Sequence, residues 1–212
     1  MVWVENGSSE IQFICSETKP NIFLIGDSIR KGYCKTVGED LDGIAETFFF
    51  HENCRSSQFI IFNMKKWAGY FDKPGLVNLI HFNCGHWDVA HWSGHPLPLT
   101  SPEEYKKNLQ IVVDLLHKFF PNAKLIFATT SPMNPDGSNG FNPRTTETIN
   151  EYNSIAKKVM EANKVPIHDI YSYMIHWESD QYADSCHLTP EAFSVLGHKV
   201  ANELKTYMEK DV

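Results

Sequence analysis

One serine and one Asp-His pair in this sequence have the residue types and the spacing for nucleophilic catalysis. Ser28 follows a short apolar run in "IFLIGDSIRKG", and Asp184 and His187 are three residues apart in "YADSCHLTPEAF". A serine hydroxyl is a weak nucleophile unless an adjacent base takes its proton, and a carboxylate on the far imidazole nitrogen holds that base in the required tautomer. The three residues therefore supply a nucleophile, a base and an orienting acid, in the chain order Ser, Asp, His.

Each of these residues also has a purely structural interpretation. A serine between a strand and a helix is a common helix cap. Asp184 and His187 would equally suit a surface loop in which the aspartate caps the next helix. Catalysis is favoured only if the fold brings the two segments together, because a triad is defined by its geometry and roles.

The elements that must position these residues alternate between strands and helices along the chain. The apolar runs that predict strands lie at 22–25, 46–50, 77–82, 124–129 and, more weakly, 165–169. A helix-compatible segment follows Ser28, and the other predicted helices lie at 57–70, 102–119, 145–163 and 190–209. We expect "TTET" to cap the helix near 145, and Thr189 to cap the last helix with Pro190 in its first position. This alternation indicates a parallel sheet covered by helices.

The chemically unusual segments gather at one edge of that predicted sheet. Ser28 follows the first strand, "ENCRSS" the second and "NCGHWD" the third, while "SPMNPDGSNGFNP" follows the fourth and "DSCHLT" precedes the last helix. Ligands of open α/β sheets bind beyond the carboxyl ends of the strands. We therefore expect the functional site at this edge.

The two motifs together resemble those of the SGNH (GDSL-type) hydrolase superfamily. "IGDSIRKG" is similar to the Gly-Asp-Ser that follows the first strand in that family, and "DSCHLTPEAF" to its Asp-x-x-His before the last helix; the match runs from about Asn21 to the C-terminal helix. The resemblance implies a flavodoxin-like three-layer α/β/α sandwich with a central, mainly parallel sheet of about five strands. It implies Ser28, Asp184 and His187 as the triad, and hydrolysis of esters, often acetyl esters, without a metal or organic cofactor.

The resemblance also implies an oxyanion hole, and here the sequence departs from the family pattern. The first donor would be the backbone N–H of Ser28. The family usually takes the second from a Gly after strand two, but "HENCRSSQF" has none, so Arg55, in preference to Ser56, would present its N–H. The third is the Asn of a Gly-x-Asn-Asp motif, where this chain has Trp87; the indole N–H of Trp87 or the side chain of Asn83 would replace it. Packing of Trp87 and turn formation by Asn83 are the structural alternatives.

A histidine-rich stretch, "HFNCGHWDVAHWSGH", contains zinc-ligand residue types but not the ligand spacing of known sites, so we expect no metal. Its aromatic faces and polar edges instead suggest a pocket wall of a kind that suits sugar rings. We expect Asp27, Gly85, His86 and Trp92 to contact the substrate, beside Trp87.

Arginine is scarce in the sequence, which has only Arg30, Arg55 and Arg144. The first two flank the proposed site elements. Either one would suit a substrate that carries a carboxylate, because a guanidinium can bind this group through two hydrogen bonds.

Composition restricts the remaining classes of function. The 212 residues suit one domain, in which 1–20 form an N-terminal extension with a candidate edge strand at "EIQFIC" and 21–212 form the hydrolase domain. A net charge of −7 argues against nucleic-acid binding, and the absence of an apolar run of about 18 residues argues against a membrane span. Five scattered cysteines without CxxC suggest free thiols, and the first residues show no secretory signal, so we expect a cytoplasmic protein.

The sequence therefore predicts a serine esterase that removes acyl groups, in particular acetyl, from a small carbohydrate or oligosaccharide. Two alternatives remain: a carbohydrate-binding module without catalysis, suggested by Trp87, and an SGNH hydrolase of the lipase or thioesterase type. A nucleotide-binding α/β protein ranks last, since neither G-x-G-x-x-G after strand one nor a P-loop lysine is present. The sequence leaves the sugar, the acyl length and the oligomeric state open.

Overall fold

A five-stranded, all-parallel β-sheet forms the centre of the protein. The computed structural model describes residues 13–137 and 140–209. The strands are β1 (Asn21–Ile25), β2 (Glu46–Phe49), β3 (Val77–Phe82), β4 (Lys124–Ala128) and β5 (Ile167–His168). Their order is β2-β1-β3-β4-β5, and each neighbouring pair is parallel. This is the flavodoxin-like order, with a topological switch point between β1 and β3, so the predicted fold class is confirmed.

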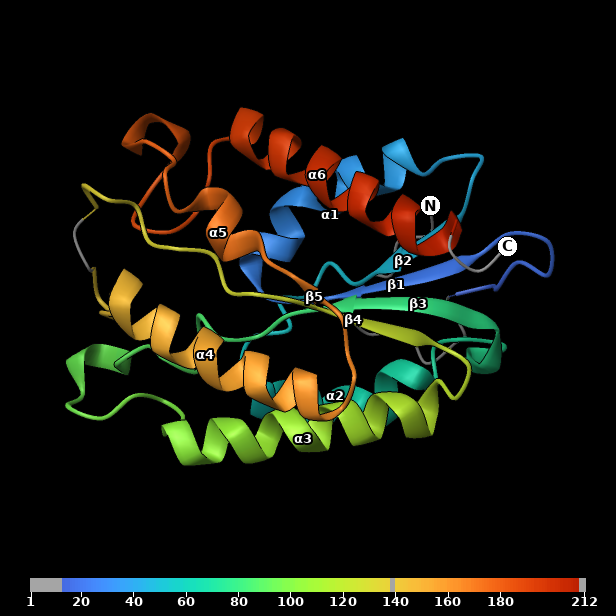
Figure 1. The fold of residues 1–212 in the computed structure, drawn as a ribbon, viewed down its shortest axis with the longest axis horizontal. Helices are drawn as coiled ribbons and strands as arrows, with labels where there is room; N and C mark the ends of the chain where they lie inside the picture. The colour runs from blue at the N-terminus through green and yellow to red at the C-terminus, as the bar shows by residue number, and fades with distance from the viewer. Residues whose placement is uncertain (1–12, 138–139, 210–212) are drawn as a thin grey trace.

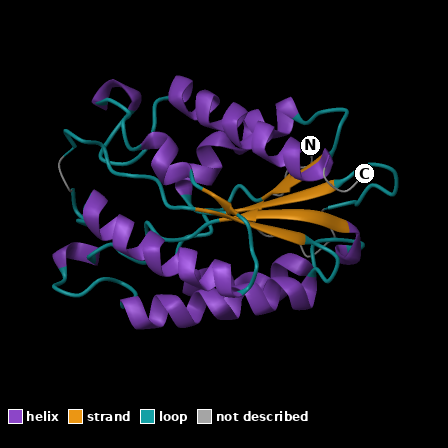
Figure 2. Ribbon diagram, in the orientation of Figure 1, coloured by secondary structure: helices purple, strands orange, loops and turns teal. Residues whose placement is uncertain are grey.

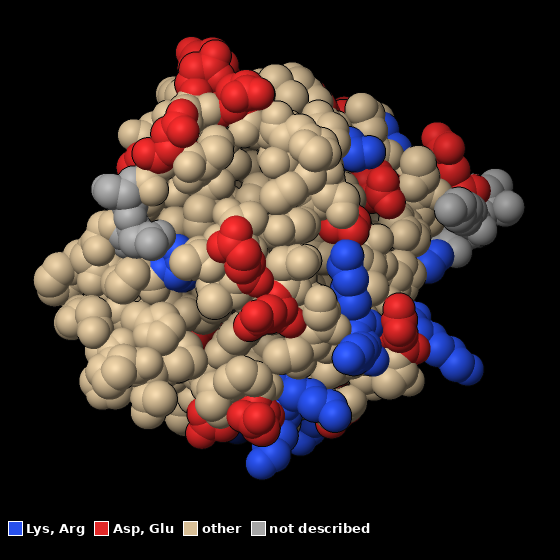
Figure 3. Space-filling model, turned by 60° about the vertical axis from the view of Figure 1, so that its left-hand side comes forward, with Lys and Arg blue, Asp and Glu red and all other residues tan. Residues whose placement is uncertain are grey.

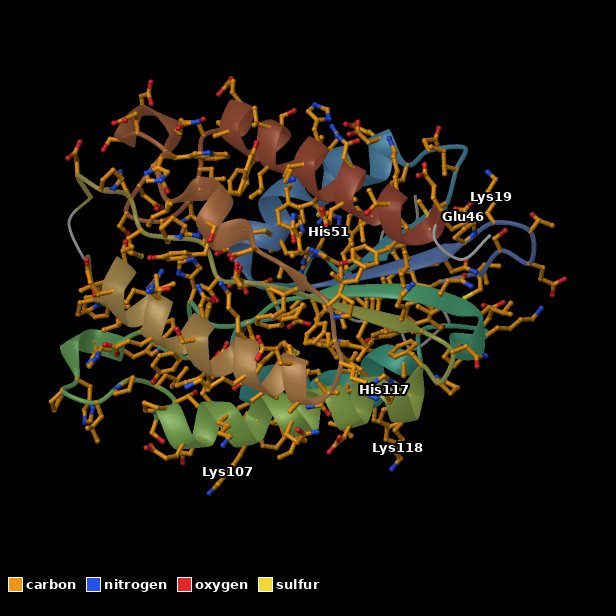
Figure 4. The ribbon with its side chains drawn as sticks, in the orientation of Figure 1. Lys19, Glu46, His51, Lys107, His117 and Lys118 are labelled. Atoms are coloured by element: carbon orange, nitrogen blue, oxygen red, sulfur yellow. The ribbon has the colours of Figure 1, made fainter. Side chains whose placement is uncertain are left out.

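Helices cover both faces of the sheet (Figures 1 and 2). On one face lie α1 (Ser28–Asp40), α5 (Ile170–Met174) and α6 (Pro190–Glu209). On the other face lie α2 (Ser57–Ala68), α3 (Pro102–Phe119) and α4 (Thr146–Ala162). Short 3₁₀ helices at Pro74–Leu76, Trp92–Gly94 and Ser179–Gln181 lie in the connections. Lys107 and Lys118 project from α3 away from the sheet (Figure 4).

Alternation along the strands divides the interior into two hydrophobic cores. On β1, Phe23 and Ile25 join the core shared with α2, α3 and α4. Ile22 and Leu24 join the core shared with α1 and α6. Because successive side chains of a strand point to opposite faces, a strand buried on both sides reads as the continuous apolar run seen in the sequence.

The predicted elements are largely confirmed, with differences at their ends. The strand at 77–82 and the helices at 102–119 and 190–209 have the predicted bounds, whereas the weak strand at 165–169 is reduced to two residues. The five-residue helix α5 was not predicted, because it is too short to show a helical period. Both expected caps are present: Thr145 and Thr148 form a capping box, and Thr189 Oγ1 accepts the Ala192 N–H at 3.2 Å.

The predicted N-terminal edge strand is described only from Phe13 onward, and residues 1–12 lie outside the described part. Phe13 forms a single parallel bridge with Phe71 and is fully buried among aromatic rings of the same domain. All five cysteines are free and buried. In the part of the chain that the structure describes, no helix is both long and apolar enough to cross a membrane.

Close packing of α1 against α6 depends on two glycines. A Cβ on Gly32 would lie 2.1 Å from the Phe193 ring, and a Cβ on Gly197 would lie 2.6 Å from the Cβ of Thr36. Both distances are far below van der Waals contact, so the helices can approach this closely only without side chains at these positions. This contact matters because Ser28 begins α1 and His187 precedes α6.

We predict that Gly197→Ala destabilises the protein although alanine is the better helix former. Overpacking costs about 1–3 kcal/mol, against a gain of about 1 kcal/mol in helix propensity. Thermal unfolding should therefore show a Tm a few degrees lower, at roughly 2–4 °C per kcal/mol. Gly75→Ala is the matched control, because its Cβ would come no closer than 3.8 Å to Asn122 Nδ2. Equal Tm values for the two variants would contradict the packing argument.

A pair of neutral histidines is buried between the sheet and the helices on the α1 side. His81 Nε2 lies 3.1 Å from His168 Nδ1, and the Tyr33 hydroxyl lies 3.5 Å from His81 Nδ1. Burial, and secondarily the charge of Lys199, lower the pKa of His168 to about 4. Burial also lowers the pKa of His81 well below its usual value. His81 is thus a core residue and takes no part in the site expected around the histidine-rich stretch.

This pair should make the free energy of unfolding fall on acidification. In the unfolded chain His168 becomes protonated below about pH 6.5, whereas in the folded protein it stays neutral until about pH 4. The free energy of unfolding therefore falls as the pH is lowered through this window, by roughly 3 kcal/mol at most. His168→Asn should flatten the dependence in urea unfolding measured from pH 7 to pH 4. The exposed His117→Asn is the control and should keep the wild-type slope. An unchanged slope in His168→Asn would exclude this origin.

Candidate active site

Ser28 lies at the turn between β1 and α1, beside the switch point of the sheet. Asp27, and not Ser28, caps the helix: Asp27 Oδ1 accepts the Ile29 N–H at 3.0 Å. Ser28 is the first helical residue, where the backbone N–H has no partner within the helix. The capping interpretation of Ser28 was therefore wrong, and its hydroxyl is available for another interaction.

That interaction is with His187, and it completes the predicted Ser-His-Asp arrangement. His187 Nε2 lies 2.8 Å from Ser28 Oγ, and His187 Nδ1 lies 2.7 Å from Asp184 Oδ2. The loop before α6 thus delivers both residues to the carboxyl end of β1. With Nδ1–H donated to Asp184, the neutral imidazole can accept the serine proton at Nε2, as nucleophilic attack requires.

Asp184 is held ionised by its own loop. Partial burial opposes ionisation, but hydrogen bonds from the backbone N–H groups of Cys186 (2.8 Å) and His187 (2.7 Å) to Oδ1 outweigh it. Together with the imidazole of His187, they lower the pKa of Asp184 to about 2. The carboxylate is therefore charged over the whole physiological range.

His187 is shifted in the opposite direction. The Cys186 sulfur, 3.8 Å from Nδ1, and the Asp184 carboxylate outweigh partial burial and raise the pKa of His187 to about 9. The imidazole is thus mostly protonated at pH 7. Because only the neutral form can accept the proton of Ser28, the arrangement is best suited to mildly alkaline conditions.

The predicted oxyanion donor Arg55 has a backbone conformation that is unusual for a residue with a side chain. Its φ is 50°, in the left-handed region that favours glycine. Its N–H donates to Asn53 Oδ1 at 2.8 Å. Asn53 lies in the wall of the cavity that contains Ser28, so the side chain of Asn53 must turn aside before this N–H can serve an oxyanion.

Two other predicted contacts are corrected by the structure. Asn83 is buried, and its Nδ2 donates to Asp27 Oδ2 at 3.3 Å instead of facing a ligand. Asp27 is fully buried, and burial raises the pKa of its carboxyl, although bonds from Ile29 and Asn83 oppose the shift. Neither residue reaches the cavity: Asn83 is not an oxyanion donor here, and Asp27 is not a substrate contact.

The cavity over the triad has a volume of about 210 Å³. Its lining residues are Ser28, Asn53, His86, Trp87, Trp92, Asn142, Arg144 and His187. The rings of Trp87 and Trp92 pack against each other with their centroids 4.5 Å apart and their planes tilted by 41°, and the Trp92 indole donates to the Trp87 carbonyl at 3.3 Å. Trp87 and Trp92 therefore form one aromatic wall, as the sequence predicted. Trp87, which carries the candidate third oxyanion donor, lines the same cavity as Ser28.

Gly85 supports this wall from behind and does not line the cavity. A Cβ at Gly85 would lie 2.0 Å from Thr130 Oγ1, so only glycine allows the loop after β3 to pack on the loop after β4. The substrate contact predicted for Gly85 is replaced by this structural role.

His86 and Arg144 form a hydrogen-bonded polar pair in the lining of the same cavity. Arg144 Nε donates to His86 Nδ1 at 3.1 Å, and His86 Nε2 lies 3.0 Å from Ser131 Oγ. Burial and the charge of Arg144 lower the pKa of His86 well below its usual value. His86 lies in the cavity as predicted. Arg144 was not assigned to the site, because its loop shows no motif in the sequence that would indicate a functional role. Its length and its single arginine were the only unusual features.

Arg30, which was considered for a carboxylate substrate, is a structural residue. Its guanidinium is fully buried and donates to the carbonyls of Phe50 (2.5 Å), Glu52 (2.6 Å) and Gly26 (3.1 Å). It ties the loop after β2 to the turn that carries Ser28. No donor of Arg30 faces the cavity.

Asp88, the last residue of "NCGHWD", fixes the loop after β3. Its carboxylate accepts the Ser57 N–H at 3.0 Å, the Ser57 hydroxyl at 2.5 Å and the Thr100 hydroxyl at 2.9 Å. Burial raises its pKa to about 6 against these bonds. Asp88 thus attaches the N-terminus of α2, next to Arg55, to the loop that carries Trp87.

The histidine-rich stretch does not converge on a metal site. His91 Nδ1 lies 2.9 Å from the His95 carbonyl, while His81 and His86 have the separate partners given above. Within the described residues, three ligand-type side chains come within 4.8 Å of one another at Asp184, Cys186 and His187. This group contains two residues of the triad, and Arg144 Nη2 donates to the Cys186 sulfur at 3.1 Å, which places a positive charge beside the thiol.

Comparison with known sequences gives one partial match. No protein-family model matches the chain. A GDSL esterase/lipase of Arabidopsis thaliana is 26% identical over 114 residues, which cover 48% of this chain and 47% of that protein. The match thus spans about half the length of this curated relative.

Solved structures share the fold over nearly the whole chain. An acetyl xylan esterase has a TM-score of 0.68 at 19% identity, covering 86% of this chain and 98% of its own. A carbohydrate acetylesterase from Sinorhizobium meliloti has a TM-score of 0.68 at 15% identity, covering 89% and 100%. A lipase/acylhydrolase from Enterococcus faecalis has a TM-score of 0.67 at 18% identity, covering 89% and 96%. At these identities the likeness establishes the fold.

The triad geometry predicts how Ser28 reacts with a fluorophosphonate probe. The rate of labelling should rise with pH, with its inflection near pH 9 and a plateau above it, because His187 must be neutral to accept the proton. Asp184→Asn should lower the rate by a factor on the order of 10²–10⁴ and move the inflection to lower pH, since a cause of the raised pKa is removed. Mass spectrometry of the labelled peptide measures both effects.

The exposed Asp180→Asn, four residues away, is the control and should behave as wild type. Labelling that is independent of pH between 6 and 9, or unaffected by Asp184→Asn, would contradict the assigned roles.

Proposed function

We propose that this chain is an SGNH (GDSL-type) hydrolase, and in particular a serine esterase that removes small acyl groups, above all acetyl, from a carbohydrate. One observation carries the proposal. Ser28, His187 and Asp184 are joined by contacts of 2.8 and 2.7 Å at the switch point of the sheet, although 159 positions separate the serine from the histidine. If Ser28 were only a helix cap, and Asp184 and His187 only residues of a surface loop, nothing would require the three side chains to meet.

The reaction follows from the roles that the geometry allows. Ser28 Oγ attacks the ester carbonyl carbon while His187 Nε2 takes the hydroxyl proton, and a tetrahedral oxyanion forms. As this intermediate collapses, His187 returns the proton to the leaving alcohol and the acyl group stays on Ser28. A water molecule then attacks the acyl-enzyme with His187 again as base, which releases the carboxylic acid and restores the serine. Asp184 holds the imidazole in one tautomer throughout.

Donors for the oxyanion come from three loops at the edge of the sheet. The backbone N–H of Ser28 is the first, at the positive end of α1. The second is the N–H of Arg55, once the side chain of Asn53 turns aside. The third is the indole N–H of Trp87, which lines the same cavity. The position filled by Asn in the family is thus served by a larger donor from the same loop.

The size of the cavity supports a small acyl group. Its volume of about 210 Å³ lies below the range of roughly 300–1,000 Å³ found for drug-sized ligands. Trp87 and Trp92 line the cavity together with Asn53 and Asn142, so it offers apolar faces and hydrogen-bonding groups that suit a sugar ring. Two structural neighbours, an acetyl xylan esterase and a carbohydrate acetylesterase, are named for the same class of substrate.

A lipase-type activity is the second candidate, and exposed apolar side chains favour it. Leu97 is 66% exposed and Phe141 is 77% exposed. They lie in the two long loops near the cavity, which are joined by the bond from Ser93 N–H to Asn142 Oδ1. Such side chains would suit a longer acyl chain, so chain-length preference separates the two candidates.

We expect wild-type protein to hydrolyse 4-nitrophenyl acetate and to release acetate from acetylated xylo-oligosaccharides. Ser28→Ala should lower kcat on the order of 10³-fold or more, because the nucleophile is lost. In a series from acetyl to octanoyl nitrophenyl esters, kcat/KM should fall with length if the cavity limits the acyl group.

Ser154→Ala, at an exposed serine of α4, is the matched control and should retain wild-type turnover. Turnover by Ser28→Ala, or none by correctly folded wild type on any ester, would overturn the proposal. A rise in kcat/KM toward octanoyl would replace it with the lipase-type activity.

A further inference from the structure

Arg144 places a positive charge in the wall of the catalytic cavity without an acidic partner. It comes from the loop between β4 and α4, immediately before the Thr145 cap. Its three hydrogen bonds go to acceptors that are not carboxylates: Nε to His86 Nδ1, Nη1 to the Asn142 carbonyl and Nη2 to Cys186 Sγ, each at 3.1 Å. Among residues 13–137 and 140–209, no carboxylate lies within ion-pair distance of this guanidinium.

The bonds of Arg144 leave part of its donor capacity free. A guanidinium has five N–H groups, so after three bonds two remain, one on each terminal nitrogen. The side chain is half-buried, and its terminal nitrogens are fixed by the loops that they contact. Two fixed donors on one charged group are the feature by which arginine recognises carboxylates.

No charge in the cavity wall compensates that of Arg144. None of the eight lining residues is acidic, and His187 adds a second positive group when protonated. Asp184 lies behind His187 and is occupied by three hydrogen bonds. Asp27, which is close enough to feel the charge of Arg144, is fully buried.

This local charge stands out because the chain as a whole has a net charge of −7. In Figure 3 the lower left of the surface is mostly uncharged, acidic side chains gather at the upper left, and most of the lysines and arginines lie at the lower centre and right. The positive cavity is therefore a local feature and not part of a basic surface.

Arg144 also borders a second cavity of about 320 Å³. Its other lining residues are His91, Gly94, His95, Pro96, Pro143, Thr145 and Thr148. Arg144 is the residue that this lining shares with the lining of the cavity over Ser28. Arg144 is thus positioned to bind the part of the substrate next to the ester.

Building on the proposed esterase function, we propose that the substrate carries a carboxylate near its ester, as in an acylated acidic sugar or hydroxy acid, and that Arg144 binds this carboxylate. The anion would take the two free N–H groups of Arg144 and leave the acyl group at Ser28. Arg144 is then a specificity-determining residue, in addition to joining the His86, Asn142 and Cys186 loops.

Binding to the Ser28→Ala protein tests this inference independently of turnover. The probes are 3-acetoxybenzoate and 3-acetoxybenzamide, which share shape and ester but differ in charge. Calorimetry should show that the benzoate binds about 10- to 100-fold more tightly. Arg144→Gln in the same background should bring the ratio of the two dissociation constants close to 1, and Arg144→Lys should retain part of it. Lys107→Gln, at a lysine that projects from α3 into solvent (Figure 4), should leave the ratio unchanged.

Two results would overturn the inference. The first is equal binding of both probes to the Ser28→Ala protein with Arg144 intact. The second is an equal loss of affinity for both probes in Arg144→Gln, which would mean that the arginine only holds the loops. The protein with Ser28 intact tests the proposed function separately. Selective binding without acetate release from either probe would reject the esterase while the carboxylate site stands. Release from both probes at equal kcat/KM would reject the carboxylate site while the esterase stands.

Discussion

The catalytic edge depends on how closely α1 packs against α6. Both helices begin at the carboxyl edge of the sheet: Ser28 is the first residue of α1, and His187 lies three residues before α6. The 2.8 Å contact between these side chains therefore reports the relative position of two helices that meet where Gly32 and Gly197 carry no side chains. Sites held by packed elements are more precise than sites held by loops alone. A shift of either helix would lengthen the distance between Ser28 Oγ and His187 Nε2, across which the proton moves, even if every residue of the triad were unchanged.

Three aspartates at this edge have the same chemistry but different functions, because their surroundings differ. Asp27 is fully buried, its pKa is raised, and it caps α1. Asp88 is also buried, with a pKa of about 6, and it connects α2 to the loop that carries Trp87. Asp184 is partly exposed and receives two backbone N–H groups, so its pKa is about 2 and it can orient a charged imidazole. Two carboxylates thus hold the loops in place, and only the third is electrostatically suited to catalysis.

The fold and the triad could be predicted from the sequence because their signals are local. Apolar runs, helix periods and caps such as Thr145 are encoded within a few residues, and the Gly-Asp-Ser and Asp-x-x-His segments define which strand end and which helix start must meet. The rest depends on which neighbour a side chain finds. The sequence does not distinguish the roles of Arg30 and Arg144, yet Arg30 is fully buried and donates to three backbone carbonyls, whereas Arg144 lines the cavity. Asn83 has the residue type of an oxyanion donor, but Asp27 lies within reach of its amide, and only the tertiary structure shows this.

The charge of the chain sets a condition on how an anionic substrate would be recognised. With a net charge of −7, the protein repels anions at long range, whereas Arg144 and a protonated His187 attract them in the cavity. At physiological ionic strength the Debye length is about 8 Å, so the distant carboxylates are screened while direct hydrogen bonds to Arg144 are not. Recognition must therefore come from contact and not from electrostatic steering. A substrate carboxylate beside Arg144 would also be close to His187 and would favour the protonated form of its imidazole. The guanidinium must therefore neutralise the charge of the carboxylate if His187 is to act as a base.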